Sequence, residues 1–150
     1  MILSKTCDYG LRATLYIAMQ KNLKYVSIRE ISDNLEISFH FLTKILQLLT
    51  QQQLLTSFRG PKGGVSLAIP AENISLRDII HAIDGPDLFE ACILGLNKCG
   101  DDNPCPLHHE WKEIRSEVGD LFRKTSLKSL ADKITADGLL LTNIEEVIRQ

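Results

Sequence analysis

The chain has 150 residues, 44% apolar and 24% charged, a size and balance that fit one globular domain with room for an extension. No apolar run approaches the ~18 residues of a membrane helix, and the start MILSKTCDYG has no apolar segment of the signal-peptide kind, so we expect a cytoplasmic protein that uses no membrane. The net charge is −2, yet residues 1–69 carry +4 (eight basic, four acidic) and residues 70–150 carry −6 (nine basic, fifteen acidic). This asymmetry favours a polyanion partner for the first half of the chain, and chance asymmetry of a solvated surface explains it equally well.

Three helices are predicted in the first fifty residues. Apolar residues recur at helical spacing over residues 4–20. A short helix follows in VSIREISDNLEIS, where Ser27 and Glu30 have the spacing of a capping box. Ser38 can cap a longer helix, FHFLTKILQLLTQQ, whose apolar residues face a core. A short helix, a tight turn and a longer helix with a polar face predict a helix-turn-helix.

The next segment, LLTSFRGPKGGVSLAI, predicts a β-hairpin. Both flanks favour strands, and the glycines and proline of RGPKGG supply turn geometry. The stretch lacks the spacing of a phosphate-binding loop. A hairpin directly after a recognition helix is a wing, and Arg59 and Lys62 at its tip are placed to touch phosphate or to enter a minor groove. A plain surface hairpin is the alternative for this piece alone.

These elements predict a winged helix-turn-helix DNA-binding domain over residues 1–84, in a fold that is mainly α with a small β-hairpin wing. In it, the first turns of the recognition helix and the wing tip meet double-stranded DNA. The expected DNA-contacting residues are Ser38, His40, Thr43, Lys44, Arg59 and Lys62. A winged helix that serves as a protein-interaction module is the rival from another functional class.

Beyond residue 70, Ser75 and Asp78 predict another capped helix, which ends at Gly85-Pro86. Residues 85–106 form a cysteine-rich loop, and a long helix follows over residues 107–124. Its apolar residues, spaced 4, 3, 4 and 3, are Leu107, Trp111, Ile114, Val118 and Leu121. Such a seam favours a dimerisation helix over residues 107–134 with its short following helix, although packing on its own domain would use the same stripe. Residues 135–150 are expected to be a tail with a weakly helical end, TNIEEVIR.

The loop carries Cys92, Cys99 and Cys105 and is followed by His108, in the spacing Cys-x6-Cys-x5-Cys-x2-His. A cytoplasmic location makes a disulfide a poor explanation. Structural zinc sites usually pair ligands two to four residues apart, and only the last two residues are that close. The open spacing favours an iron–sulfur cluster, with zinc on three cysteines and a histidine as the alternative. No activated nucleophile or acid–base pair stands out, so the chain is not expected to be an enzyme or to act on a small-molecule substrate.

The chain resembles the bacterial IscR and NsrR family of winged-helix, iron–sulfur transcription regulators over about residues 1–133. The likeness lies in LSKTCDYGLRA, SIREISDNLEIS, RGPKGGVSL, ISLRDIIHAIDG and the cysteine loop. It implies a homodimer that binds promoter DNA, with long helices crossing between subunits and one cluster per subunit. It also implies that the three loop cysteines are thiolate ligands.

Two branches of that family differ in the fourth ligand. IscR-like members use a histidine three residues after the last cysteine, which His108 matches, whereas some NsrR-like members use an aspartate of the other subunit, which Asp8 matches. The first cysteine gap, x6, is longer than the usual x5. We slightly favour His108 and a [2Fe-2S] cluster over Asp8 and a [4Fe-4S] cluster. Cys7 matches no family role and is expected to be a small buried residue.

The resulting hypothesis is a homodimeric, sequence-specific transcriptional regulator, expected to act as a repressor. It would sense nitric oxide, redox state, or iron and cluster status through a bound iron–sulfur cluster. Gain, loss or nitrosylation of that cluster would change the order of the loop and so the spacing of the two DNA-reading heads. The alternatives are a cluster-free, thiol- or metabolite-responsive regulator of the same fold, a zinc-binding one, or the interaction module named above.

Overall fold

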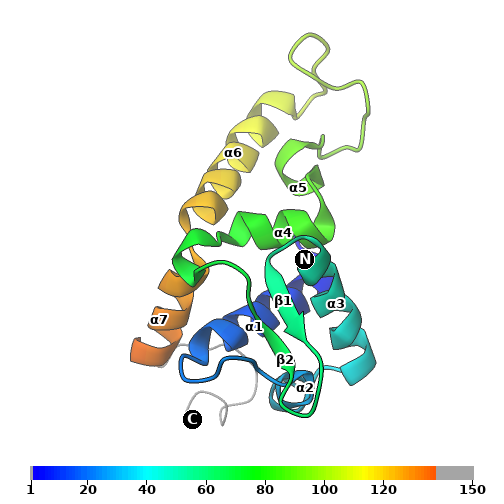
Figure 1. Cartoon of the computed structure of the whole chain (residues 1–150). Coiled ribbons are helices and arrows are strands. Elements are labelled where there is room, and N and C mark those ends of the chain that lie inside the picture. The colour runs from blue at the N-terminus through cyan, green and yellow to red at the C-terminus, as the bar shows by residue number, and fades with distance from the viewer. Residues whose placement is uncertain (1, 138–150) are drawn as a thin grey trace.

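The structure, a computed structural model, describes residues 2–137 and is mostly helical with one two-stranded antiparallel sheet, as the sequence predicts (Figure 1). In chain order the elements are α1 (Lys5–Met19), α2 (Ile28–Leu35), α3 (Phe39–Gln51), β1 (Leu55–Phe58), β2 (Gly64–Leu67), the 3-10 turn η1 (Ala71–Asn73), α4 (Leu76–Asp84), α5 (Asp87–Glu90), α6 (His108–Lys124) and α7 (Leu127–Asp137). Within residues 2–137, no helix is both long enough and apolar enough to cross a bilayer.

The molecule has a compact body and a projecting arm. Helices α1 to α4, the hairpin and α7 form the body, with α7 packed back against α1 (Figure 1). Helix α6 rises from the body past α4 and α5, and the cysteine loop lies at its far end. Because α6 has 17 residues, it is about 25 Å long and carries the loop away from the body.

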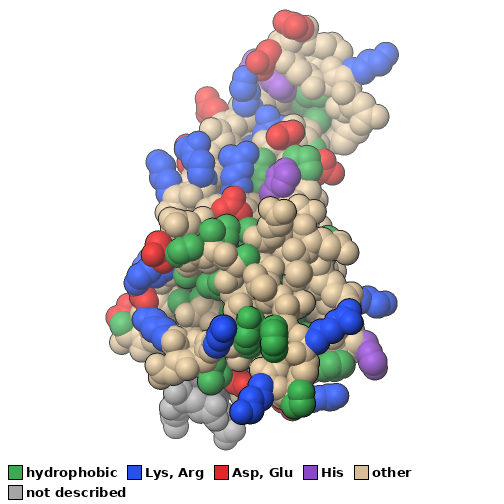
Figure 2. Space-filling view, viewed as in Figure 1, with side chains coloured by type: hydrophobic (Ala, Val, Ile, Leu, Met, Phe, Trp, Pro, Cys, Tyr) green, Lys and Arg blue, Asp and Glu red, His purple; other side chains and the backbone are tan. Residues whose placement is uncertain are grey.

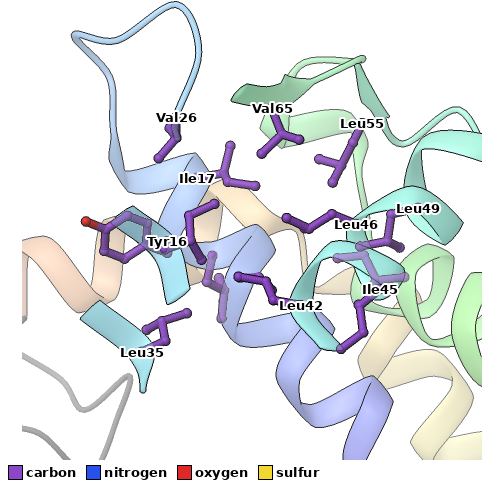
Figure 3. Packing of buried hydrophobic residues seen from close by; sticks show 14 of the residues in the cluster. Tyr16, Ile17, Val26, Leu35, Leu42, Ile45, Leu46, Leu49, Leu55 and Val65 are labelled. Carbon is purple, nitrogen blue, oxygen red and sulfur yellow. The ribbon is translucent and has the colours of Figure 1, made fainter. Parts of the chain in front are cut away.

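The body core joins the three N-terminal helices to the hairpin (Figure 3). The predicted inner face of α3 is confirmed, since its fully buried residues are Leu42, Ile45, Leu46 and Leu49. Phe41 and Leu48, expected on the same face, are only half-buried. Val26 of the α1–α2 connection and Val65 of β2 close the core from the hairpin side, and their backbones exchange hydrogen bonds of 2.8 and 2.9 Å. The recognition helix is therefore fixed on its inner face and free on its outer face.

The helix starts follow the predicted caps only in part. At α2, the Ser27 side chain accepts from the backbone of Glu30, but the reciprocal bond is missing because the Glu30 carboxylate accepts from the Tyr16 hydroxyl at 2.9 Å. At α3, Ser38 occupies the predicted N-cap position, but its side chain makes no capping bond. The capping box at Ser75 is complete.

The turn between α2 and α3 is made by residues 36–38. Glu36 adopts the left-handed conformation (φ 52°), and the buried Ser32 hydroxyl donates to the carbonyl of Ile37 at 2.6 Å. Non-glycine residues pay about 1–2 kcal/mol for this conformation. Burial of the Ile37 side chain in the core offsets this cost. The turn thereby fixes the angle between α2 and α3.

The hairpin pairs β1 and β2 in register, with Leu55 opposite Leu67 and Phe58 opposite Gly64. Two glycines allow the wing to close tightly. A Cβ on Gly63 would lie 2.1 Å from the Phe58 carbonyl oxygen, and one on Gly64 would lie 2.1 Å from the Val26 carbonyl oxygen. The close approach at Gly63 keeps the exposed wing loop, residues 59–63, tightly turned, and the one at Gly64 holds the start of β2 against Val26.

Helix α6 uses two faces. Gly119 and Phe122 face α5, where Phe122 meets the Phe89 ring edge-on at 6.4 Å between centroids. On the other side Leu107, Ile114 and Leu121 are 47%, 53% and 61% exposed. One face of α6 therefore packs on the rest of the chain, while a stripe of apolar side chains on another face stays exposed.

Two details differ from the expected layout, and a third, the burial of Cys7, confirms an expectation. The short helix α5 lies inside the segment expected to be loop. Helix α7 continues to Asp137, past the expected start of the tail, and the weakly helical end TNIEEVIR lies outside the described residues. Cys7 is fully buried, with Ile80 and Phe89, in a second small core under the arm.

Candidate metal centre and nucleic-acid interface

The three loop cysteines converge, and none is in a disulfide. The Sγ atoms of Cys92, Cys99 and Cys105 all lie within 4.8 Å of one another. The Cys92 and Cys105 sulfurs are 3.7 Å apart, and the backbone N–H of Cys105 donates to the Cys99 sulfur at 3.4 Å. All three residues are half-buried, so their thiols remain within reach of solvent.

The loop curls around these sulfurs through local backbone turns. The N–H of Gly95 donates to the Cys92 carbonyl at 3.0 Å, and the N–H of Cys99 donates to the Leu96 carbonyl at 3.1 Å. Gly95 has φ 72°, a conformation that glycine adopts without strain. The backbone at Leu96 hydrogen-bonds the Cys92 sulfur and lowers the pKa of that thiol to about 7, whereas burial raises the pKa of the Cys105 thiol.

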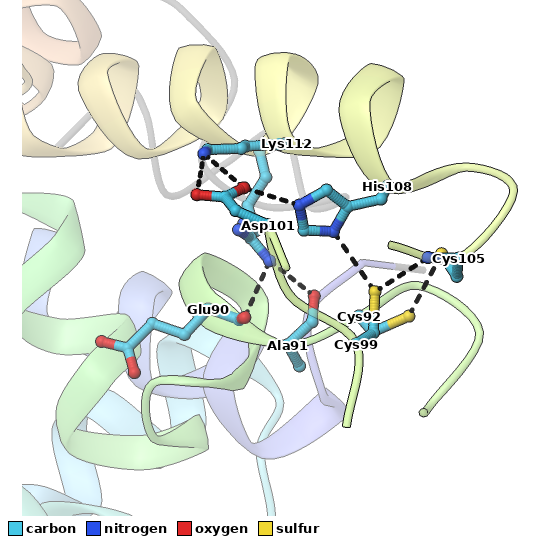
Figure 4. A network of polar contacts seen from close by, with 9 residues as sticks. Glu90, Ala91, Cys92, Cys99, Asp101, Cys105, His108 and Lys112 are labelled. Carbon is cyan, nitrogen blue, oxygen red and sulfur yellow. Dashed lines mark hydrogen bonds and ion pairs between the residues drawn. The ribbon is translucent and has the colours of Figure 1, made fainter. Parts of the chain in front are cut away.

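His108 joins the cysteines from the first turn of α6 (Figure 4). Its Nδ1 lies 3.2 Å from the Cys99 sulfur, and its Nε2 lies 2.8 Å from a carboxylate oxygen of Asp101. Lys112, one turn further along α6, donates to both oxygens of that carboxylate at 2.8 Å. These hydrogen bonds, first from His108 and then from Lys112, lower the pKa of Asp101 to about 2.

These groups line a pocket of about 230 Å³ between the loop and α6. Sequence reasoning named the cysteines and the histidine but missed Asp101 and Lys112. The available signal was the four-residue spacing of His108 and Lys112 on one helix face, with an acid in the preceding loop.

Asp8 lies apart from this group within the chain. It sits in the first turn of α1 and pairs with Arg12, whose Nε and terminal nitrogen donate to its two oxygens at 3.1 and 2.8 Å. It does not line the pocket. Ligation by Asp8 requires a second subunit, as the sequence argument assumed.

The base of the loop is tied together independently of the cysteines. The indole N–H of Trp111 donates to the Ala91 carbonyl at 2.9 Å. Arg115 donates to the carbonyls of Glu90 and Ala91 at 2.7 and 2.9 Å. The end of α5 is therefore attached to the first two turns of α6.

The residues expected to contact DNA lie on one side of the body. Ser38, His40 and Lys44 are exposed on α3 or at its start, and Arg59 and Lys62 are exposed in the wing loop. Thr43 is half-buried and its hydroxyl donates to the Phe39 carbonyl at 2.7 Å, so it offers mainly its methyl group. Figure 2 shows Lys and Arg side chains on the lower body, where α2, α3 and the hairpin lie.

A groove runs between α3 and the hairpin. It brings Thr43 and Arg59 together, and Gln47, Thr50 and Gln51 continue it along α3. Gln47 is exposed on that side, and a glutamine can hydrogen-bond adenine in a bidentate manner. Sequence reasoning stopped at the first turn and missed Gln47, although it lies one helical turn after Thr43 on the polar face.

Comparison with known proteins agrees with the fold. The sequence pattern of the Rrf2 family, described as iron-dependent transcriptional regulators, matches residues 3–133. The chain is 31% identical to the HTH-type transcriptional regulator NsrR of Oceanobacillus iheyensis over 98% of this chain and 100% of that one. It is 28% identical to the regulator IscR of Vibrio campbellii, over 87% and 77% respectively.

Among solved structures, the fold is similar to that of CymR, the global cysteine regulator of B. subtilis, with a TM-score of 0.75 and 25% identity over 87% of this chain and 95% of that one. The family match covers most of the chain and includes both the winged helix and the cysteine loop. The chain therefore belongs to the Rrf2 family of iron-dependent, winged-helix transcriptional regulators, which bind DNA and are not enzymes.

Proposed function

We propose that this protein is a homodimeric promoter-binding regulator, acting as a repressor in the bacterial cytoplasm, whose DNA affinity is set by an iron–sulfur cluster. The ligands would be Cys92, Cys99, Cys105 and His108. The observation that carries the proposal is the convergence of three sulfurs within 4.8 Å, with an imidazole nitrogen 3.2 Å from one of them. The likeness to regulators named NsrR and IscR supports it.

The donor set fits iron in a cluster. Thiolates are the usual ligands of such clusters, and a histidine nitrogen replaces thiolate in Rieske two-iron centres. The lowered pKa of Cys92, about 7, favours the thiolate form that binds metal. A neutral imidazole favours a [2Fe-2S] over a [4Fe-4S] cluster, which Asp8 of a partner subunit would complete. When bound, the cluster supplies a centre that can be lost, oxidised or nitrosylated.

One observation favours zinc as a second candidate. With Zn–S bonds of about 2.3 Å, the edge of a ZnS₄ tetrahedron is about 3.8 Å. The Cys92 and Cys105 sulfurs are 3.7 Å apart. Two thiolates on one iron of a [2Fe-2S] cluster would have the same separation, but the third sulfur, which lies within 4.8 Å of the other two, would have to bind the second iron. The loop would therefore have to open to accept a cluster, whereas zinc would fit the three sulfurs as they lie. The polar loop has few buried contacts to resist this opening.

The chain offers a direct route from the loop to the recognition helix. Helix α6 starts at the loop and ends beside α4, where the backbone N–H of Leu76 donates to the Thr125 carbonyl at 2.9 Å. Helix α4 in turn packs against α3. We propose that a change in loop order shifts α6 relative to its copy in the partner subunit, along the exposed stripe of Leu107, Ile114 and Leu121. That shift would alter the spacing of two recognition helices on DNA.

In this proposal, residues 1–84 bind DNA, residues 85–106 hold the cluster and residues 107–134 form the dimer interface. The α3–wing groove would take the duplex, with Arg59 in a minor groove and Ser38, His40, Lys44 and Lys62 on bases and phosphates. Nitric oxide, redox state and cluster status remain the candidate signals for the same metal centre.

The test is anaerobic purification followed by visible absorption spectroscopy and counts of iron, sulfide and zinc per chain. The proposal predicts a brown protein with equal numbers of iron and sulfide ions per chain. Cys99→Ala should lose this chromophore, and Cys7→Ala should keep it. One zinc per chain without iron would establish the second candidate. A protein that holds neither iron nor zinc would favour the alternative of a thiol-responsive regulator. If promoter DNA shows no salt-dependent shift with the protein in a binding assay, promoter binding itself is contradicted.

A further inference from the structure

Among residues 2–137, the carboxylate of Asp101 hydrogen-bonds both the imidazole of His108 and the ammonium of Lys112, one turn further along α6. It accepts from Nε2 of His108 at 2.8 Å and from the Lys112 ammonium at 2.8 Å. We propose that Asp101 is a positioning residue that presents Nδ1 of His108, rather than Nε2, to the metal. This inference rests on the proposed function, because it concerns how the fourth ligand of that site is held.

The argument begins with the tautomer. An ionised carboxylate can only accept hydrogen bonds, so the proton shared with Asp101 sits on Nε2. In a neutral imidazole, Nδ1 then carries the free lone pair. That nitrogen is the one that lies 3.2 Å from the Cys99 sulfur. The hydrogen bond on the outer nitrogen therefore selects the inner nitrogen as the ligand.

Orientation is the second step. The imidazole of His108 lies in the first turn of α6, and without a fixed partner its ring could rotate and offer either nitrogen. Lys112 contacts both oxygens of Asp101, so the carboxylate is held against the helix that carries His108. The side chain of His108 is only 11% exposed, whereas that of Asp101 is 67% exposed. Asp101 thus acts as an outer brace on an inner ligand.

The first measurement needs no metal. Full-length protein is labelled with ¹⁵N-histidine, stripped of metal, and its imidazole ¹⁵N shifts are recorded at about pH 8, above the ordinary pKa of a free imidazole. The parent should show His108 with the proton on Nε2. Asp101→Ala should give a mixture or the opposite tautomer, while Asp101→Asn, whose carbonyl still accepts, should restore the parent signal. A parent with the proton on Nδ1, or an unchanged spectrum in Asp101→Ala, would overturn the inference.

The second measurement uses the loaded protein. Loss of a bracing partner of a metal-binding histidine typically weakens the site about 10–100-fold. The rate of metal loss to a chelator should rise by that factor in Asp101→Ala and return close to the parent value in Asp101→Asn. Asp102→Ala is the matched control, since the exposed Asp102 makes no hydrogen bond or ion pair among residues 2–137. Equal rates in Asp101→Ala and Asp102→Ala would refute the brace.

The two hypotheses fail in different ways. A parent protein without any metal contradicts the proposed function, and the tautomer result then decides alone whether Asp101 orients the ring. A parent with a stable cluster, together with an unaffected Asp101→Ala variant, leaves the proposed function intact and removes Asp101 from it.

Discussion

In the proposed homodimer, Leu121→Lys should separate the two subunits without unfolding either of them. In the single chain Leu121 is 61% exposed, although it continues the apolar stripe of α6. Complete burial of a leucine contributes about 1.5–3 kcal/mol, so covering the exposed fraction in a dimer would contribute about 1–2 kcal/mol per subunit. A two-fold interface contains the residue twice. The dimer should therefore weaken by about 2–4 kcal/mol, or roughly 30–1,000-fold in dissociation constant.

Sedimentation velocity over a range of protein concentrations measures this shift. Lysine is as good a helix former as leucine, and exposed substitutions usually change folding stability by less than ~0.5 kcal/mol, so the far-ultraviolet circular dichroism should match that of the parent. Leu23→Lys is the matched control, because Leu23 is 49% exposed but lies between α1 and α2, away from the stripe. A Leu121→Lys protein that remains as dimeric as Leu23→Lys would refute the assignment of the stripe.

Three further predictions concern the wing, the metal ligands and a helix cap. Arg59→Ala should weaken operator binding by about 1–3 kcal/mol in a titration at fixed salt, with an unchanged fold; equal affinity and salt slope would remove the wing from the interface. His108→Ala should shorten the lifetime of the cluster under anaerobic spectroscopy more than Asp8→Ala does, and the reverse order would indicate a cluster completed by the partner subunit. Ser75→Ala breaks the complete capping box of α4 and should cost about 1 kcal/mol, which calorimetry should detect as a melting temperature about 2–4 °C lower.

Local sequence signals predicted the elements that local forces determine. The hairpin follows from turn residues that its tight closure requires, as the close approach at Gly63 and Gly64 shows. The core face of α3 follows from spacing alone. At Glu30, however, a tertiary partner prevailed, since the Tyr16 hydroxyl took the carboxylate that a local capping box would have used.

Features that depend on folding were not predictable from the pattern. Helix α5 has four residues, too few for a periodicity, and it exists because Phe89 docks between α4 and α6. Asp101 resembles its exposed neighbours in sequence, and only the reversal of the loop brings it to His108. Whether Asp8 approaches a cluster depends on a second subunit, which no single-chain pattern encodes.

The bonds from Trp111 and Arg115 to Ala91 close the cysteine loop into a ring before any metal binds. The entropic cost of bringing the ends of such a segment together grows only slowly with its length. Here the fold of the rest of the protein already holds the two ends together. The thiols are thus held at high local concentration whether or not they are ligated. Under the proposed function, release and recapture of the metal would take place within one closed loop, so the site would empty and refill while the body stays folded.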